Sequence, residues 1–266
     1  QDQERILLQG DYVLPIGEKA QFELGYRGNF NNLSTDYEVA LLDDTDTFYV
    51  DNTLSNILNY KEYINAVYTQ YGSKHGKLSY LLGLRLENTR ITIDQPSSYD
   101  YSKKDYTGLF PTVNLNYELS DDESITLGYS RRLRRPRSFF INPFPSRSSV
   151  TSVFKGNPDL KPSLTTENEI GLNASFLDRF TLDAAYSNQE SSDQFMLVSL
   201  FAPANAGKNR QWQNVGNLDT NTFEFTLNSQ IVETKDWSWD LGINFTFGAQ
   251  LSYVGTAGLE NNLVSN

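Results

Sequence analysis

The side chains that most often carry out nucleophilic or acid–base chemistry are scarce in this sequence. The 266 residues contain no Cys and a single His, His75, which lies in the polar stretch 73–77. Without Cys there is no thiol catalysis and no Cys-ligated zinc or iron–sulfur centre, and a solvated His in a turn is a poor candidate for a general base. Although 33 Asp and Glu are present, no pair is marked by its spacing. We therefore expect no catalytic residue, no enzyme activity, no metal and no cofactor.

A cluster of guanidinium groups is the strongest binding feature of the sequence. Five Arg fall within seven residues: Arg131, Arg132, Arg134, Arg135 and Arg137. Arg binds carboxylates and phosphates through two parallel hydrogen bonds, so this cluster could contact the phosphates of lipopolysaccharide or guide an anionic ligand. In the alternative interpretation, the Arg side chains pair with acids of the same chain, such as Glu118 or Glu169.

Two other segments carry candidate binding residues. The stretch 31–56 is rich in carboxylates, which can bind calcium, but it lacks the spacing of the twelve-residue calcium loop, so a solvated acidic loop is predicted. Its acids are Asp36, Glu38, Asp43, Asp44, Asp46 and Asp51. In 191–213, the rings of Phe195, Phe201 and Trp212 could form a stacking platform for a sugar or a hydrophobic cap. Packing of these aromatic side chains on one another is the alternative.

The elements that hold these residues are indicated by alternation of large apolar residues with small or polar ones. In 237–248 every second residue is Trp, Leu, Ile or Phe, and Ser, Asp, Gly, Asn or Thr lie between them. This period of two is typical of β-strands with one apolar face. It recurs in 6–14, 22–26, 78–87, 112–119, 125–129, 170–176, 180–186 and 223–231. In 57–71 both registers carry aromatic side chains, and we predict that Ile64, Ala66 and Tyr68 face outward.

The connections between these strands alternate between short and long. Short turns are expected near 15–19, 72–77, 120–123, 178–179 and 233–236, and long connections near 31–56, 91–108, 134–165 and 191–213. About ten strands in five hairpins follow, each with roughly 9 to 11 residues to cross a bilayer at a tilt. Tight periplasmic turns opposite long extracellular loops are typical of outer-membrane barrels, as are aromatic side chains such as Trp237, Trp239 and Tyr12 near strand ends.

Composition agrees with an all-β, antiparallel, transmembrane up-and-down β-barrel. The net charge of −11 argues against a nucleic-acid-binding protein, whose affinity rests on neutralising phosphates with Lys and Arg. The mean hydropathy of −0.50 fits barrel strands, because their alternation leaves the average polar. A soluble β-sandwich binding module is the alternative, since soluble antiparallel sheets also alternate apolar and polar residues.

One connection contains a distinctive run of turn-forming residues. It comprises Asn157, Pro158, Asp159, Leu160, Lys161 and Pro162. Each Pro fixes its own φ and biases the preceding residue toward extended geometry, so the run is expected to aim the chain back into the next strand. Because none of these side chains is chemically reactive, a structural corner without a ligand role is the favoured interpretation.

The chain around this run resembles the barrel region of TonB-dependent outer-membrane receptors, particularly the barrel family widespread in Bacteroidota. The resemblance rests on the strings YSRR, RP, NPF, GNPDLKP and EIGL within 129–172, followed by QNVGNLDTNTFEFTL and WSWDLGINFTF. It covers about residues 105 to 250 well and the rest by pattern only. The family usually has Glu after the LKP of this run, where this chain has Ser163, so either Glu167 is the candidate for the role of that Glu or the role is lost.

The resemblance implies a 22-strand barrel with an N-terminal plug that contacts TonB. Residues 1–266 are then expected to be a portion of the barrel, without the plug and the remaining strands, in the bacterial outer membrane. A smaller barrel with its own closure is the alternative. The implied function is capture of a nutrient at extracellular loops for TonB-dependent uptake, and the implied partners are membrane lipid, the TonB complex, the nutrient and a surface lipoprotein. An outer-membrane barrel enzyme of the lipase or protease type is the rival function within the same fold.

Overall fold

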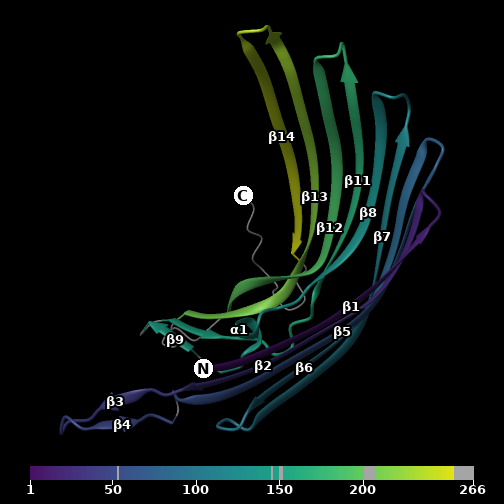
Figure 1. The fold of residues 1–266 in the computed structure, drawn as a ribbon. Helices are drawn as coiled ribbons and strands as arrows, with labels where there is room; N and C mark the ends of the chain where they lie inside the picture. Colours follow the sequence, from purple (N-terminus) through teal and green to yellow (C-terminus); the bar gives the residue numbers. More distant parts are fainter. Residues whose placement is uncertain (53, 145, 150–151, 201–207, 255–266) are drawn as a thin grey trace.

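The chain folds into one large curved sheet (Figure 1). The structure is a computed structural model that describes residues 1–52, 54–144, 146–149, 152–200 and 208–254. Ten long strands follow one another in the sheet, and each pairs antiparallel with the long strands beside it. They are β1 (Asp2–Ile16), β2 (Ala20–Tyr37), β5 (Asn56–His75), β6 (Leu78–Gln95), β7 (Asp100–Glu118), β8 (Glu123–Arg134), β11 (Ser163–Phe176), β12 (Phe180–Leu200), β13 (Lys208–Glu233) and β14 (Ser238–Val254). This is the up-and-down order that the sequence predicts.

Short elements lie in the long connections. The hairpin β3 (Ala40–Leu42) and β4 (Phe48–Val50) projects from the connection between β2 and β5. The connection between β8 and β11 contains one turn of helix, α1 (Ser138–Ile141), followed by β9 (Ser146–Ser149) and β10 (Ser152–Lys155). β10 pairs in parallel with the start of β13 and so joins the large sheet. No helix in the described part of the chain is long and apolar enough to cross a membrane.

The five short turns gather at one end of the sheet and the long connections at the other (Figure 1). Gly17 and Gly76 occupy two of these turns with φ of 64° and 59°, a left-handed conformation that Gly adopts without strain. His75 lies in the second turn, as the last residue of β5. The five predicted short turns are therefore confirmed, whereas the connections at the other end range from four residues between β6 and β7 to the stretch 135–162 between β8 and β11.

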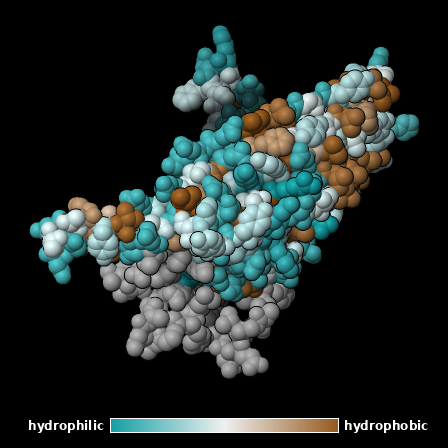
Figure 2. Space-filling view, turned by 90° about the horizontal axis from the view of Figure 1, so that it is seen from below, coloured by the Kyte–Doolittle hydropathy of each residue, from teal (hydrophilic) through white to brown (hydrophobic). Residues whose placement is uncertain are grey.

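The two faces of the sheet differ in chemistry near the short turns. Leu82, Leu84 and Leu86 point outward and are 44–46% exposed. Their partners in the adjacent strand β7 lie on the same face and include Val113, paired with Leu82, and Leu109, paired with Leu86. Between them, inward-facing positions carry residues such as Asn114 and Thr126. Figure 2 shows the apolar side chains collected toward the right of the molecule, with hydrophilic ones over most of the rest of that face.

The prediction that Ile64, Ala66 and Tyr68 face outward is wrong. Ala66 lies opposite Glu87, and Tyr68 lies opposite Arg85, so Ile64, Ala66 and Tyr68 share the inward face with charged residues. Val67, opposite Leu86, points outward instead. The sequence misled because Tyr residues occur in both registers, and the correct register becomes clear only from the pairing with β6.

The strands are also longer than expected, with 12 to 26 residues each. Much of what the sequence predicts as long connections is strand: 91–108 contains only the four-residue gap between Gln95 and Asp100. Among the described residues, β1 pairs only with β2, and β14 pairs only with β13, so the sheet is open in this chain.

Candidate functional site

The outward face of the sheet changes from apolar to polar beyond Leu82, Leu84 and Leu86 of β6. On the outward face of β6, Leu86 is followed by Asn88, Arg90, Thr92 and Asp94. The adjacent strands carry outward polar residues at the same height, because Asn88 pairs with Asn65 of β5 and with Thr107 of β7. Because exposed charges are not tolerated against lipid tails, this level is the limit of the face that suits contact with lipid.

Above this boundary the inward face becomes apolar and closes around a small core. Its buried residues are Leu58, Tyr60, Ile91, Ile93, Ile141, Leu160 and Phe195. Leu33, Tyr106, Phe140 and Trp212 pack against them. The core is assembled from β5, β6, β12 and the connection between β8 and β11. This connection therefore folds inward, over the inward face of the sheet at the end opposite the short turns (Figure 1). We call this end of the sheet the mouth.

Hydrogen bonds fix the folded-in connection to several strands. Gln95, which is fully buried, donates from Nε2 to Oδ1 of Asn142 at 2.5 Å. Lys104 Nζ donates to the carbonyl oxygen of Leu160 at 2.5 Å. Asn214 accepts from the backbone N–H of Lys161 and donates to its carbonyl oxygen. Burial in this region lowers the pKa of Lys104, because the apolar surroundings disfavour its charge.

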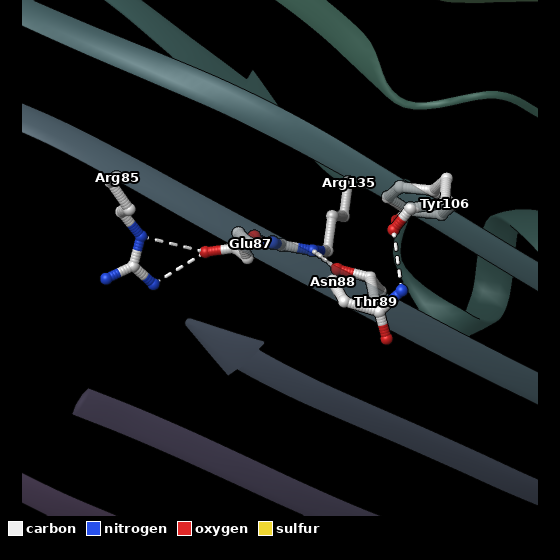
Figure 3. Close-up of polar contacts among 6 residues, drawn as sticks. All are labelled: Arg85, Glu87, Asn88, Thr89, Tyr106 and Arg135. Atoms are coloured by element: carbon white, nitrogen blue, oxygen red, sulfur yellow. Dashed lines mark hydrogen bonds and ion pairs between the residues drawn. The ribbon is translucent and has the colours of Figure 1, made fainter. Parts of the chain in front are cut away.

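Arg135 connects the folded-in connection between β8 and β11 to strand β6 (Figure 3). Its guanidinium forms an ion pair with Glu87 and donates from Nε to the hydroxyl of Thr89 at 3.3 Å. The second oxygen of Glu87 accepts from two nitrogens of Arg85, at 2.6 and 3.0 Å. Glu87 is only 7% exposed, so one buried carboxylate is neutralised by two guanidinium groups.

The other Arg residues of the predicted cluster separate. Arg132 points inward and forms an ion pair with Glu167 at 3.3 Å. Arg134, which is also inward and exposed, lies with its guanidinium carbon 4.9 Å from the ring centre of Phe195. Arg131 points outward, where it lines a depression of about 320 Å³ with Glu190 and Asp219. Pairing with acids is thus observed for Arg132 and Arg135, although the partners are Glu167 and Glu87 rather than Glu118 or Glu169.

The aromatic residues of 191–213 pack on the folded-in connection. Trp212 stacks on Phe140 with 4.1 Å between ring centres, and Phe195 lies 5.8 Å from the same ring. Phe195 is 7% exposed, and both it and Trp212 pack on the ring of Phe140, a partner that neither interpretation of the sequence named. Phe201 lies outside the residues that the structure describes.

The run Asn157–Pro162 forms a corner of the chain beneath this core. Asn157 donates its backbone N–H to the carbonyl oxygen of Phe140 at 2.7 Å, and its side chain accepts from the backbone N–H of Asp159. Leu160 is 1% exposed. These contacts hold the corner against α1 and the core, and the absence of a ligand role stays a prediction. Glu167, the candidate for the role of the family's Glu, pairs with Arg132.

In the acidic connection 31–56, Asp43 is the centre of a hydrogen-bonded turn. The carboxylate of Asp43 accepts hydrogen bonds from the backbone N–H groups of Thr45 and Thr47 and from the hydroxyl of Thr45. Hydrogen bonds to the backbone of Thr47 and to Thr45 lower the pKa of Asp43, because they stabilise its charged form. No group of three or more potential ligands converges among the described residues.

Comparison with known proteins identifies the architecture. The model of the outer membrane protein beta-barrel family matches residues 1–265. The chain belongs to this family. Among solved structures, the FrpB iron transporter from Neisseria meningitidis (F3-3 variant) superposes over 94% of this chain and 36% of its own, with a TM-score of 0.60 and 13% identity. At that identity the likeness concerns the fold alone.

Two sequence relatives of this outer membrane protein are TonB-dependent receptors. SusC from Bacteroides thetaiotaomicron is 27% identical over 205 residues, which cover 66% of this chain and 20% of SusC. Receptor P3 from Formosa agariphila is 21% identical over 201 residues, covering 67% of this chain and 20% of the relative. The matched part thus spans about a fifth of the length of these curated relatives. The family membership identifies the bacterial outer membrane as the location of the chain.

Sequence reasoning missed the acids that hold the mouth together. Glu87 continues an alternating strand and carries no local sign of its role, since its partner Arg135 is 48 positions further along the chain (135 − 87). Glu62 was also missed. Burial raises its pKa, while Arg135 and a hydrogen bond from Tyr60 act in the opposite direction. One signal could have drawn attention to Glu87: it is the acidic residue that follows the last outward Leu of its strand.

Proposed function

We propose that this chain forms part of the barrel of a receptor that captures a nutrient at its extracellular mouth for TonB-dependent uptake. The single observation that carries the proposal is membership of the outer membrane protein beta-barrel family over residues 1–265. The kinship with two TonB-dependent receptors supports it. So does the polar inner wall of the sheet, which suits a hydrated passage. The proposed role requires no covalent chemistry.

Within the mouth, we assign ligand contact to the Arg residues that remain exposed inside it. Arg132 is 72% exposed at its side chain despite the ion pair with Glu167, and Arg134 is exposed beside Phe195. Arg137, at the start of α1, is exposed as well. Guanidinium groups in this position favour an anionic part of the nutrient. Phe195 lies under the guanidinium of Arg134, and Trp212 stacks on Phe140 in the same core.

The proposed transport requires parts that lie outside this chain. These are the further strands that close the barrel, because the open edges of β1 and β14 would leave backbone groups unpaired in lipid, and a plug that an energising TonB complex acts on. A surface lipoprotein is a further proposed partner. Each of these comes from the kinship with longer receptors.

Growth on single nutrients tests the proposal. A strain lacking the gene and a strain lacking TonB are compared with the parent on a panel of sole carbon and iron sources. We expect the two strains to lose growth on the same nutrient, and the gene on a plasmid to restore growth only where TonB is present. If the gene-deleted strain fails on a nutrient that the TonB-deficient strain still uses, the proposed function is wrong.

A further inference from the structure

Three cationic side chains lie together on the outward, convex face of β5, β6 and β7. Lys61 lies opposite Thr92, and Thr92 lies opposite Lys103. Arg90 follows on the same face of β6, two residues closer to the membrane. All three cations are exposed, and Arg90 is 60% exposed at its side chain. They form a cationic triangle on three adjacent strands.

Two acids on the same face, Asp105 and Asp94, compensate this triangle only in part. Asp105 accepts from Nε of Arg90 at 2.8 Å and from Asn88 at 2.7 Å. In the part of the chain that the structure describes, Lys61 and Lys103 form no ion pair. Asp94 lies on the same face of β6, two residues beyond Thr92, so three cations and two carboxylates leave one positive charge on a small area. Like charges on neighbouring strands repel one another, so a bound anion would stabilise this arrangement.

The level of the triangle relative to the lipid indicates which anion can reach it. The outward apolar column of β6 ends at Leu86, and Arg90 is four residues further along the strand. At about 3.3 Å per residue this is about 13 Å along a tilted strand, just above the hydrocarbon. Lipid headgroups occupy this level. A phosphate of the outer leaflet would therefore meet these side chains without leaving its own layer.

A groove continues upward from the triangle on the same face. It has a volume of about 640 Å³, and its lining includes Lys61 and Thr92 together with Asn59, Asp94 and the exposed ring of Tyr101. Hydroxyl-rich sugars suit such a mixture of amide, carboxylate and aromatic groups. Asp2 and Glu4 also line the groove, and with Asp94 they would repel a second phosphate there. The phosphate is therefore confined to the lower, cationic part.

We propose that this face binds a phosphorylated glycolipid of the outer leaflet. Its phosphate contacts Lys61, Arg90 and Lys103, and its sugars lie in the groove above. The site is on the outside of the barrel and is independent of nutrient capture at the mouth. Arg131 is a weaker candidate for the same role, because Glu190 and Asp219 line its depression and balance its charge.

The test uses the full-length protein purified from the outer membrane in detergent. The variant K61Q/R90Q/K103Q is compared with K19Q/R179Q/K235Q, which removes two Lys and one Arg from exposed positions in the short turns. Binding of diphosphoryl lipid A is followed by native mass spectrometry, with dephosphorylated lipid A and inorganic phosphate as separate arms. We expect the first variant to bind diphosphoryl lipid A at least about tenfold more weakly, since charge-assisted contacts are lost.

The control variant should bind as the unchanged protein does, and removal of the phosphates from the lipid should abolish the difference between the two variants. Equal binding by both variants would overturn the proposal. So would binding of inorganic phosphate alone that shows the same dependence on the three cations, because the ligand would then be free phosphate and not a lipid. Retained heat-dependent migration on gels verifies that each variant is folded.

Discussion

Glu87 illustrates what a single residue contributes to the mouth. Its carboxylate is 7% exposed and lies between the guanidinium groups of Arg85 and Arg135. Removing one partner of a buried pair leaves the other charge without compensation, at a cost of about 3–5 kcal/mol. We predict that Glu87→Ala lowers the free energy of unfolding by about 3 kcal/mol, measured by urea unfolding of the protein in lipid vesicles.

The double variant E87Q/R135Q is the matched control for this prediction. Because it removes both charges together, its loss of stability should be smaller than the sum of the losses measured for the single variants E87Q and R135Q. Additive losses would show that the two side chains do not stabilise each other, and would contradict the role assigned to Arg135 in holding the folded-in connection.

Glu62 gives a second prediction, which concerns pH. It lies above the lipid boundary, and burial raises its pKa, partly opposed by Arg135 and Tyr60. The folded state therefore binds the proton more tightly than the unfolded state, and this contribution is present at low pH and lost as the pH rises through the raised pKa. We predict that Glu62→Gln is more stable than the unchanged protein at pH 7.

The advantage of Glu62→Gln should disappear toward pH 4, below the ordinary value of 4.5, where Glu62 is protonated in both states. Unfolding in urea at several pH values measures it. A difference that is constant with pH would mean that the gain does not come from ionisation of Glu62.

At the scale of elements, the corner at Asn157–Pro162 depends on a close backbone approach. A Cβ at Gly156 would collide with the backbone nitrogen and oxygen of Asn142, and neither atom can move without shifting α1. We predict that Gly156→Ala loosens the connection between β8 and β11, seen as faster amide hydrogen exchange in 138–144 and 156–162. Gly10→Ala is the control, because a Cβ there meets nothing within 4 Å.

Unchanged exchange in these two segments of Gly156→Ala would contradict the tight corner. Faster exchange throughout the sheet would indicate a general loss of folding instead. The exchange rates of β14 and of residues 222–233 of β13, next to the short turn between these two strands, serve as the internal reference.

The strands could be predicted from sequence wherever one face meets lipid and the other meets water. In 237–248 the two faces differ at every position, and β14 has the predicted register. In 57–71 Tyr60, Tyr63, Tyr68 and Tyr71 occur in both registers, so pattern alone chose the wrong face. The predicted lengths of the long connections were too large, because the strands continue beyond the lipid boundary. There the apolar residues face inward, so the alternation that marks a membrane strand is reversed.

The candidate site was predictable only in part. The clustering of Arg131–Arg137 is visible in the sequence, and so is pairing with acids as one of two outcomes. The particular partners are not, because Glu87 and Glu167 are brought to these residues by the order of the strands. The cationic triangle was missed for the same reason, since Lys61, Arg90 and Lys103 are separate in sequence and adjacent only across β5, β6 and β7.

At the scale of the whole molecule, the sheet consists of two zones with opposite polarity. Near the short turns the apolar residues face outward, and beyond Leu86 and Val67 they face inward around the core of the mouth. The first zone suits a membrane and the second suits water on the outside. Both the proposed nutrient capture and the proposed lipid site depend on the position of this change, because it sets the level of the membrane.

Site-directed spin labelling tests this arrangement most directly, and the absence of Cys from the sequence removes any background. Single Cys substitutions at each position from 81 to 94 are labelled in the protein in lipid vesicles. Positions 82, 84 and 86 should be accessible to oxygen dissolved in lipid, whereas positions 88, 90, 92 and 94 should be accessible to a water-soluble nickel reagent. If positions 82, 84 and 86 are shielded from both reagents, these side chains lie in a dry protein core and the membrane barrel is wrong.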